Sequence, residues 1–196
     1  VVVDGSVATY TPSANFNGSD SFTFMVSDGE LTDTDTVTLT ITAVNDAPVL
    51  ASVSDVSFDE DGSGSISLSA SDIDEDSLTF SITEGSDITA TLDGSDVTFS
   101  APANYNGSET FTISVSDSDL VDSQSITVTV NAVNDAPVAT ADLTGTTNED
   151  QSIVVTLSGS DIDGDALSFS LDTDASNGSV VVDGSFATYT PSTNFN

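Results

Sequence analysis

The chain has 196 residues, of which 33 are acidic, and it contains no Lys, Arg, His, Cys or Trp. Without His, Lys or Cys it cannot build a Ser-His-Asp or Cys-His relay, a Schiff base, or a zinc, haem or iron–sulfur site of the usual ligand types. Its formal charge of −33 repels phosphate backbones and anionic lipid headgroups, and no run of about 18 apolar residues could span a bilayer. We therefore expect no enzymatic activity, no nucleic-acid partner and no membrane insertion.

Sequence motifs recur at a fixed spacing along the chain. The segment Val44-Asn45-Asp46-Ala47-Pro48 returns 89 positions later as Val133-Asn134-Asp135-Ala136-Pro137. The segment Asp72-Ile73-Asp74 returns at the same spacing as Asp161-Ile162-Asp163. Self-similarity of this kind indicates tandem structural repeats.

The repeat divides the chain into three expected domains. We predict the C-terminal half of one repeat at residues 1–48, a complete repeat at 49–137 and the N-terminal half of another at 138–196. Residues 1–17 and 180–196 differ at only two positions, which are Val7/Phe186 and Ala14/Thr193. Two interpretations remain open. The chain is an excerpt of a longer array, or it forms a filament in which the tail of one chain completes the head of the next.

Within the complete repeat, apolar residues alternate with Ser and Thr. This period of two is typical of strands with one buried face, and turn dipeptides such as Asp93-Gly94 and Asn106-Gly107 separate the runs. The predicted strands lie near residues 51–58, 64–70, 78–83, 88–92, 96–100, 109–116 and 124–131. Seven short strands without a helix predict an all-β protein of tandem seven-stranded Greek-key β-sandwiches, one complete and two partial.

Six aromatic side chains are expected in the sandwich cores, because they fall on the apolar phase of the alternation. They are Phe22, Phe24, Phe80, Phe99, Phe111 and Phe169.

The acidic residues concentrate in loops, and strand order places these loops at the two ends of each sandwich. One end of the complete repeat gathers Asn45, Asp46, Asp72, Asp74, Asp76, Asp117 and Asp119. The other end gathers Glu60, Asp61, Asn104, Asn106, Asn134 and Asp135, together with Asp161, Asp163 and Asp165 of the next repeat. Each junction between repeats therefore collects carboxylate and amide oxygens around a short linker.

Crowded carboxylates repel one another, and this chain has no cation of its own to neutralise them. Ca²⁺ accepts six to eight oxygen ligands in flexible geometry, whereas Mg²⁺ demands strict octahedral geometry. The alternative is a solvated acidic surface of the halophilic kind. We favour Ca²⁺ as the cofactor because the acids cluster in loops and the exposed strand faces carry mostly Ser and Thr.

Several motifs together resemble bacterial cadherin-like repeats, which are related to the VCBS and cadherin-type modules of large surface adhesins. They are the Val-Asn-Asp-Ala-Pro linker, the Glu60-Asp61 pair, the Asp-Ile-Asp-x-Asp loop, and the segments beginning at Pro12 and Phe22. The resemblance implies sandwiches strung end to end, with Ca²⁺ rigidifying the junctions. It implies ligands at Asn45, Asp46, Glu60, Asp72, Asp74, Asn134, Asp135, Asp161 and Asp163.

The function expected from these features is that of a calcium-rigidified spacer in an extracellular adhesin or surface fibre. Its partners would be neighbouring copies of the same repeat or chain. The alternative is a carbohydrate-binding module of a secreted protein, with glycan contact through Tyr105 or an Asn loop. Three Asn-x-Ser sites at Asn17, Asn106 and Asn177 fit the glycosylation pattern, although two lie in the repeated Asn-Gly turn.

Overall fold

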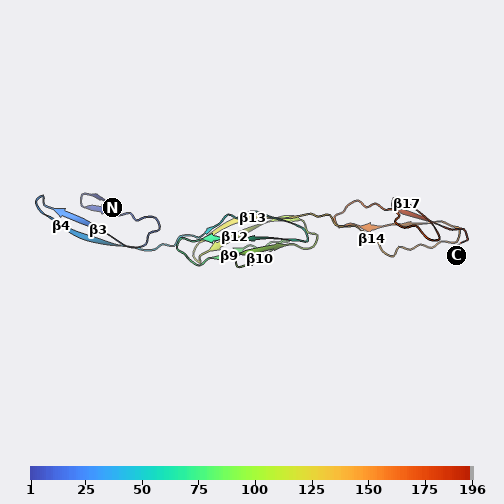
Figure 1. Cartoon of the computed structure of the whole chain (residues 1–196), viewed down its shortest axis with the longest axis horizontal. Helices are drawn as coiled ribbons and strands as arrows, with labels where there is room; N and C mark the ends of the chain where they lie inside the picture. The colour runs from blue at the N-terminus through green and yellow to red at the C-terminus, as the bar shows by residue number, and fades with distance from the viewer. Residues whose placement is uncertain (195–196) are drawn as a thin grey trace. The chain divides into compact units, whose positions relative to one another are not determined.

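The computed structural model describes residues 1–194, and every regular element among them is a β-strand (Figure 1). Within these residues, no helix is long and apolar enough to cross a membrane. Contacts divide the chain into two compact units. The first holds residues 1–58, 62–102 and 107–130, and the second holds residues 59–61, 103–106 and the chain from Asn131 onward.

The complete repeat is a sandwich of two main sheets. One sheet has the order β6 (Val56–Asp59), β13 (Val121–Asn131), β12 (Gly107–Ser116) and β9 (Thr79–Ile82). The other has the order β10 (Thr89–Asp93), β11 (Asp96–Ser100) and β7 (Ser63–Ser67). A separate two-stranded sheet pairs β5 (Val49–Leu50) with β8 (Ala70–Ser71). In Figure 1, β12 and β13 run beside one another, in the register that joins Gly107 to Val130.

Alternating side chains of the two sheets form the core. In β12, Phe111, Ile113 and Val115 have no exposed surface, and the Thr and Ser residues between them face outward. The ring of Phe99 in the opposite sheet packs edge-on against Phe111, with the ring centroids 5.4 Å apart. The predicted all-β sandwich is therefore confirmed, with the core on the predicted face of each strand.

Strands β6 and β13 lie side by side and run in the same direction. The residue numbers of bonded pairs rise together on both strands, as they do between parallel strands. Asp55 Oδ1 accepts from Thr127 N at 2.7 Å, and four residues later Asp59 Oδ1 accepts from Asn131 Nδ2 at 3.1 Å. Strand β6, near the start of the repeat, is thus joined directly to its last strand, β13.

The strand predicted at 51–58 is wrong in its first half. Residues 51–55, between β5 and β6, form no strand, because their backbone makes no regular series of hydrogen bonds to a neighbouring strand. Side chains of β13 replace the ladder there. Gln124 Oε1 accepts from Val53 N at 3.1 Å, and Gln124 Nε2 donates to Leu50 O at 3.1 Å. Asp122 Oδ2 accepts from Leu50 N at 2.8 Å.

The N-terminal segment consists of two hairpins, each forming a two-stranded sheet. They pair β1 (Val2–Asp4) with β2 (Val7–Thr9), and β3 (Gly18–Ser27) with β4 (Thr32–Ile41). The expected burial of Phe24 is wrong, since its side chain is 48% exposed. Its counterpart in the complete repeat faces a second sheet, whereas β3 and β4 pair only with each other.

The C-terminal segment contains one three-stranded sheet and one short pair. The sheet has the order β15 (Ile153–Thr156), β18 (Phe186–Pro191) and β17 (Gly178–Asp183), and the pair is β14 (Val138–Ala139) with β16 (Gly159–Ser160). Residues 168–171, which correspond to β9 at the repeat spacing, form no strand. Phe169 in that stretch is only half-buried.

Candidate metal centre

Three carboxylates meet in the loop between β8 and β9. Asp72, Asp74 and Asp76 each offer an oxygen, and these oxygens all lie within 4.8 Å of one another. The loop holds its own shape, because Asp72 Oδ1 accepts from Asp74 N at 2.8 Å and from Asp76 N at 3.4 Å. Asp72 Oδ2 is buried and has no hydrogen-bond partner within residues 1–194. A buried carboxylate oxygen without a donor is costly unless another group satisfies it.

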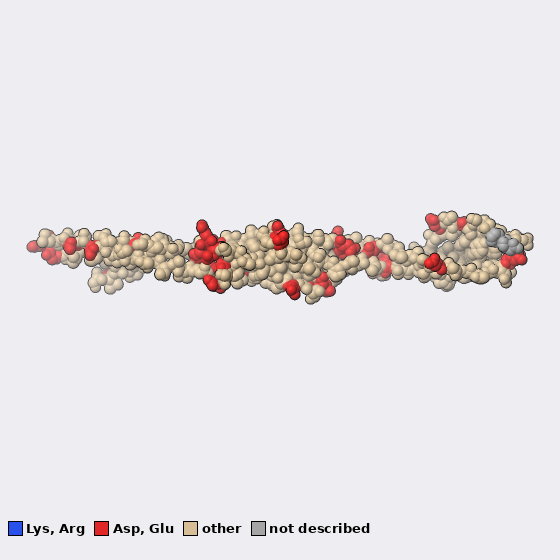
Figure 2. All heavy atoms as spheres, turned by 90° about the horizontal axis from the view of Figure 1, so that it is seen from below, with Lys and Arg blue, Asp and Glu red and all other residues tan. Residues whose placement is uncertain are grey.

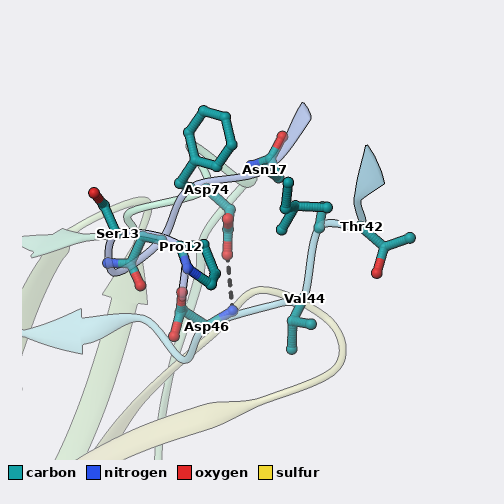
Figure 3. Close-up of a pocket in the computed structure, with 11 residues that line it drawn as sticks. Pro12, Ser13, Asn17, Thr42, Val44, Asp46 and Asp74 are labelled. Carbon is teal, nitrogen blue, oxygen red and sulfur yellow. Dashed lines mark hydrogen bonds between the residues drawn. The ribbon is translucent and has the colours of Figure 1, made fainter. Parts of the chain in front are cut away.

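The linker before the complete repeat is tied to this loop. Asp74 Oδ2 accepts from Asp46 N at 2.7 Å, and Figure 3 shows the carboxylate pointing at that nitrogen. A cavity of about 250 Å³ lies beside this bond. It is bordered by Pro12, Asn17 and Val44, which are labelled in Figure 3. Asp46 and Asp74 both line this cavity, so their carboxylates border a space large enough for a small ion.

Asp117, at the tip of the β12–β13 hairpin, holds the linker from a second side. Its Oδ2 accepts from Asn45 Nδ2 at 2.8 Å, and its Oδ1 accepts from Leu120 N at 2.6 Å and from Asp119 N at 2.8 Å. The side chain is only 7% exposed. These donors, the Leu120 amide first and the Asn45 amide next, lower the pKa of Asp117 from its usual value.

The opposite electrostatic effect acts on Asp76. Desolvation raises its pKa, and the negative charges of Asp72 and Asp74 raise it further, followed by those of Asp117 and Asp119. Four carboxylates of one junction therefore act on a fifth, that of Asp76. Any cation bound there would relieve this repulsion.

The second unit repeats this loop around Asp161. Asp161 Oδ1 accepts from Asp163 N at 3.0 Å and from Asp165 N at 3.1 Å, and Asp163 Oδ2 accepts from Asp135 N at 2.7 Å. Gly164 has a φ of 78°, as Glu75 has a φ of 61° at the same place in the first loop. In the described part of the chain, only the first loop brings three carboxylate oxygens within 4.8 Å of one another.

Glu60 and Asp61 belong to the same second unit. Glu60 is 7% exposed, and its Oε1 accepts from Val133 N at 2.5 Å. Asp61 Oδ1 accepts from Asn104 N at 3.1 Å. Desolvation raises the pKa of Asp135, and the charges of Asp163, Asp61, Glu60 and Asp161 raise it further.

The structure thus brings the predicted site residues together in two groups. The first consists of Asn45, Asp46, Asp72, Asp74, Asp76 and Asp117. The second consists of Glu60, Asp61, Asp135, Asp161, Asp163 and, through its amide, Asp165. Asn134 lies in the linker of the second group, and its Nδ2 donates to Asp135 O at 2.9 Å.

The sequence did not identify the backbone amides that fix these carboxylates. The amides of Leu120, Val133 and Asn104 each donate to a site residue. The first could have been inferred from the Asp-x-x-Leu turn between two alternating runs, since Asp at the start of a tight turn accepts from the following amides. The other two join residues 73 and 43 positions apart, and no local pattern signals such pairs.

On the face drawn in Figure 2, carboxylates gather in separate patches, with uncharged surface between them. No basic side chain exists in the sequence to pair with them. The side chains gathered in the two groups carry carboxylate and amide oxygens, which suit a hard cation such as Ca²⁺.

The family described as Bacterial Ig domain matches residues 1–42, 45–131 and 134–196. A comparison with the curated proteins finds no match.

Several solved structures are similar in fold. The first two domains of human protocadherin-24 share 24% identity at a TM-score of 0.41, covering 61% of this chain and 62% of that one. The surface layer protein SbsC, domains 1–6, shares 17% identity at a TM-score of 0.36, covering 91% and 25%. An endo-fucoidan hydrolase of glycoside hydrolase family 107 shares 20% identity at a TM-score of 0.36, covering 94% and 31%. The chain spans less than two thirds of each of these proteins.

Proposed function

Because the chain belongs to the bacterial Ig domain family, we propose that it is a calcium-stiffened structural spacer of an extracellular adhesin or surface fibre. Its repeats are of the cadherin-like type found in such proteins. On this proposal the function of the molecule is mechanical. Each sandwich is a rigid body, and Ca²⁺ at the acidic junctions limits the movement of the linkers between sandwiches.

One observation carries the proposal. Three carboxylate oxygens of Asp72, Asp74 and Asp76 converge in a chain without any basic side chain, and beside them the buried Oδ2 of Asp72 lacks a donor. A structure that gathers charge in this way without neutralising it is unfavourable, and a divalent cation removes the cost. The recurrence of the same hydrogen bonds around Asp161 supports a role repeated at each junction.

The residues proposed to hold the ion are those of the two groups described above. At the first junction the carboxylates of Asp72, Asp74 and Asp76 are the central ligands, and Asn45 and Asp117 position the linker. At the second, Glu60, Asp135, Asp161 and Asp163 take these places. When bound, Ca²⁺ supplies positive charge and joins oxygens of the linker to oxygens of the loops.

A calcium titration of the full chain tests the proposal. Extracellular calcium modules bind at about 10⁻⁴–10⁻³ M, and an ion at about ten times its Kd stabilises the folded state by about 1.4 kcal/mol. We expect Tm to rise in millimolar Ca²⁺ and to rise less in equal Mg²⁺. Small-angle X-ray scattering should give a larger maximum dimension in Ca²⁺ than in EDTA.

A matched pair of variants makes the test specific. The double substitution Asp72→Asn and Asp74→Asn should remove the part of the calcium-dependent rise in Tm that comes from the first junction. Asp87→Asn removes a charge at an exposed carboxylate that is not among those acting on Asp76, and it should leave the rise intact. An unchanged Tm and maximum dimension on adding Ca²⁺ to the wild-type chain would contradict the proposal.

A further inference from the structure

A short segment at the start of the complete repeat, residues 49–54, is held differently from the strands around it. We call this segment the strap, and it contacts β8 on one side and β13 on the other. On the β8 side it is held by backbone bonds, in the register that joins Leu50 to Ala70. Just past this pair, Ala51 N donates to Ser69 O at 2.9 Å. Backbone pairing on this side therefore holds only the first half of the strap.

On the β13 side, two side chains hold the strap. Asp122 Oδ2 accepts from Leu50 N at 2.8 Å, and Gln124 Oε1 accepts from Val53 N at 3.1 Å. Gln124 Nε2 also donates to Leu50 O at 3.1 Å and to Ala51 O at 3.2 Å. Asp122 and Gln124 thus do for the strap what backbone pairing with β13 does for β6.

The strap also buries little apolar surface. Leu50 is 3% exposed, whereas Val49 beside it is 61% exposed and Val53 is half-buried. In β6, by contrast, Val56 and Phe58 are both 8% exposed. Segments with few buried apolar contacts open locally at a lower free energy than the core of a domain. Opening the strap should therefore cost less than separating β6 from β13.

The position of the strap along the chain places it first under tension. The linker at residues 44–48 leads directly into the strap, and the strap leads into Asp55. Asp55 Oδ1 accepts from Thr127 N at 2.7 Å, at the point where the contact between β6 and β13 begins. A pull on the linker consequently reaches the strap before it reaches the two parallel strands.

The strap and the candidate metal centre share the strand β8. Val49 pairs with Ser71, the last residue of β8, and Asp72 follows directly. Two residues further on, Asp74 Oδ2 accepts from Asp46 N of the linker at 2.7 Å. The acidic loop and the strand before it therefore hold the chain both at Asp46 and at Val49. An ion bound in this loop would fix both attachments.

We propose that the strap is a releasable element, which opens as one unit while the sandwich stays folded, and that an ion at the Asp72 loop keeps it closed. Opening joins the linker and the strap into one flexible segment, so the junction loses its stiffness before the sandwich loses its fold. The control by the ion rests on the proposed function, whereas the opening itself does not. An ion that binds more tightly when the strap is closed stabilises the closed strap to the same extent.

Hydrogen exchange of the full chain in EDTA, followed by NMR, tests the opening. The amides of Leu50, Ala51 and Val53 are the donors of the strap bonds described above. We expect these three amides to share one opening equilibrium, to exchange faster than the amides of β11, and to be insensitive to low urea. Protection equal to that of β11 overturns the proposal, as do unrelated opening equilibria for the three amides.

Two adjacent residues of β13 provide a matched pair of variants. Gln124→Ala removes the three bonds of that side chain and should raise the opening equilibrium of the strap by at least about tenfold. Ser125→Ala changes an exposed residue on the other face of the strand and should leave the opening unchanged. The amides of β11 report unfolding of the whole sandwich. An equal rise in exchange at β11 and at the strap in Gln124→Ala overturns the proposal.

The same measurement in millimolar Ca²⁺ separates this proposal from the proposed function. Ca²⁺ should slow the exchange of the three strap amides severalfold in the wild-type chain and not in the double variant Asp72→Asn and Asp74→Asn. A rise in Tm on adding Ca²⁺ with no change at the strap overturns the control by the ion and leaves the proposed function standing. If Ca²⁺ changes neither, the proposed function fails with it, and the opening in EDTA still stands or falls with Gln124→Ala.

Pulling single chains by their two ends tests the mechanical consequence. We expect a small reversible extension at low force, before the sandwich ruptures. Gln124→Ala should lower the force of this first step and leave the rupture force unchanged, because β6 and β13 still pair. Rupture of the sandwich without an earlier step, or an equal fall of both forces in Gln124→Ala, overturns the proposal.

Discussion

The side-chain nitrogen of Asn45 donates a 2.8 Å hydrogen bond to Oδ2 of Asp117, a carboxylate that is 7% exposed and 72 positions further along the chain. This bond joins the linker to the hairpin tip of the sandwich that follows it. The linker is consequently part of the folded repeat rather than a free tether, even before any ion is bound.

We predict that Asn45→Ala loosens the linker. The amide of Asp46 should exchange with solvent several-fold faster, because the Asn45 anchor next to it is lost while its own acceptor on Asp74 remains. Hydrogen exchange followed by NMR measures this directly. Ser54→Ala, a surface substitution with no contact to the linker, serves as the control. Unchanged exchange at Asp46 would mean that the bond from Asn45 does not hold the linker.

The same side chain in two repeats should respond differently to truncation. Phe111 is fully buried, and Phe111→Ala is expected to destabilise the complete repeat by about 3–5 kcal/mol through loss of packing and creation of a cavity. Phe22, its counterpart in β3, is only partly buried. Phe22→Ala should leave the complete repeat as stable as before. The measurement is the urea concentration at the midpoint of its unfolding, followed through the amide signals of β11 and β13. Equal effects of the two substitutions on these amides would contradict this prediction.

Gly85 lies where no side chain fits. A Cβ there would overlap the carbonyl oxygen of Ile88 and lie 2.7 Å from Cζ of Phe111. We expect Gly85→Ala to destabilise the complete repeat by about 1–3 kcal/mol, the usual cost of overpacking. Ser86→Ala, at the next and exposed position, should change the free energy of unfolding by less than about 0.5 kcal/mol. Urea denaturation compares the two variants, and similar midpoints would show that the loop adjusts.

The acid titration of Asp20 depends on Tyr10. The Tyr10 hydroxyl donates to Asp20 Oδ2 at 2.6 Å, and this bond, with the Ser21 amide, lowers the pKa of Asp20 below its usual 3.8. A lowered folded pKa means that the bond stabilises the N-terminal segment above pH 3.8 and that this stability is lost as the pH falls through the folded pKa.

Tyr10→Phe should therefore raise the pKa of Asp20 towards its usual value, as measured by NMR titration of the carboxyl carbon. Tyr189→Phe is the control, because the Tyr189 hydroxyl donates to the carbonyl of Asn177 and not to a carboxylate. An Asp20 pKa that does not move in Tyr10→Phe would show that the Ser21 amide alone lowers it.

Strand positions were predictable wherever burial on one face sets the pattern. Residues 96–100 were predicted as a strand and form β11 with those bounds, because Val97 and Phe99 are buried while their neighbours are exposed. The run predicted at 64–70 is divided between β7, which pairs with β11, and β8, which pairs with β5. Alternation cannot report a change of partner sheet, since both parts keep the same period.

The acidic site was predictable in its composition but not in its internal contacts. Strand order was enough to group Asp72, Asp74 and Asp117 with the linker, since loops at one end of a sandwich must meet. The bond from Val133 N to Glu60, and the bridge that Gln124 forms to Leu50, join segments distant in sequence. Such bonds depend on the packed positions of both strands, which no local pattern records.

The direct pairing of β6 with β13 determines how one repeat would respond to tension. A pull on the two ends of the repeat draws β6 and β13 past one another lengthwise, because the two strands run in the same direction. The bonds of Asp55 to Thr127 and of Asp59 to Asn131 are then loaded together rather than one at a time. A repeat built this way resists stretching by shear, so its rupture force should far exceed that of a hairpin peeled open from one end.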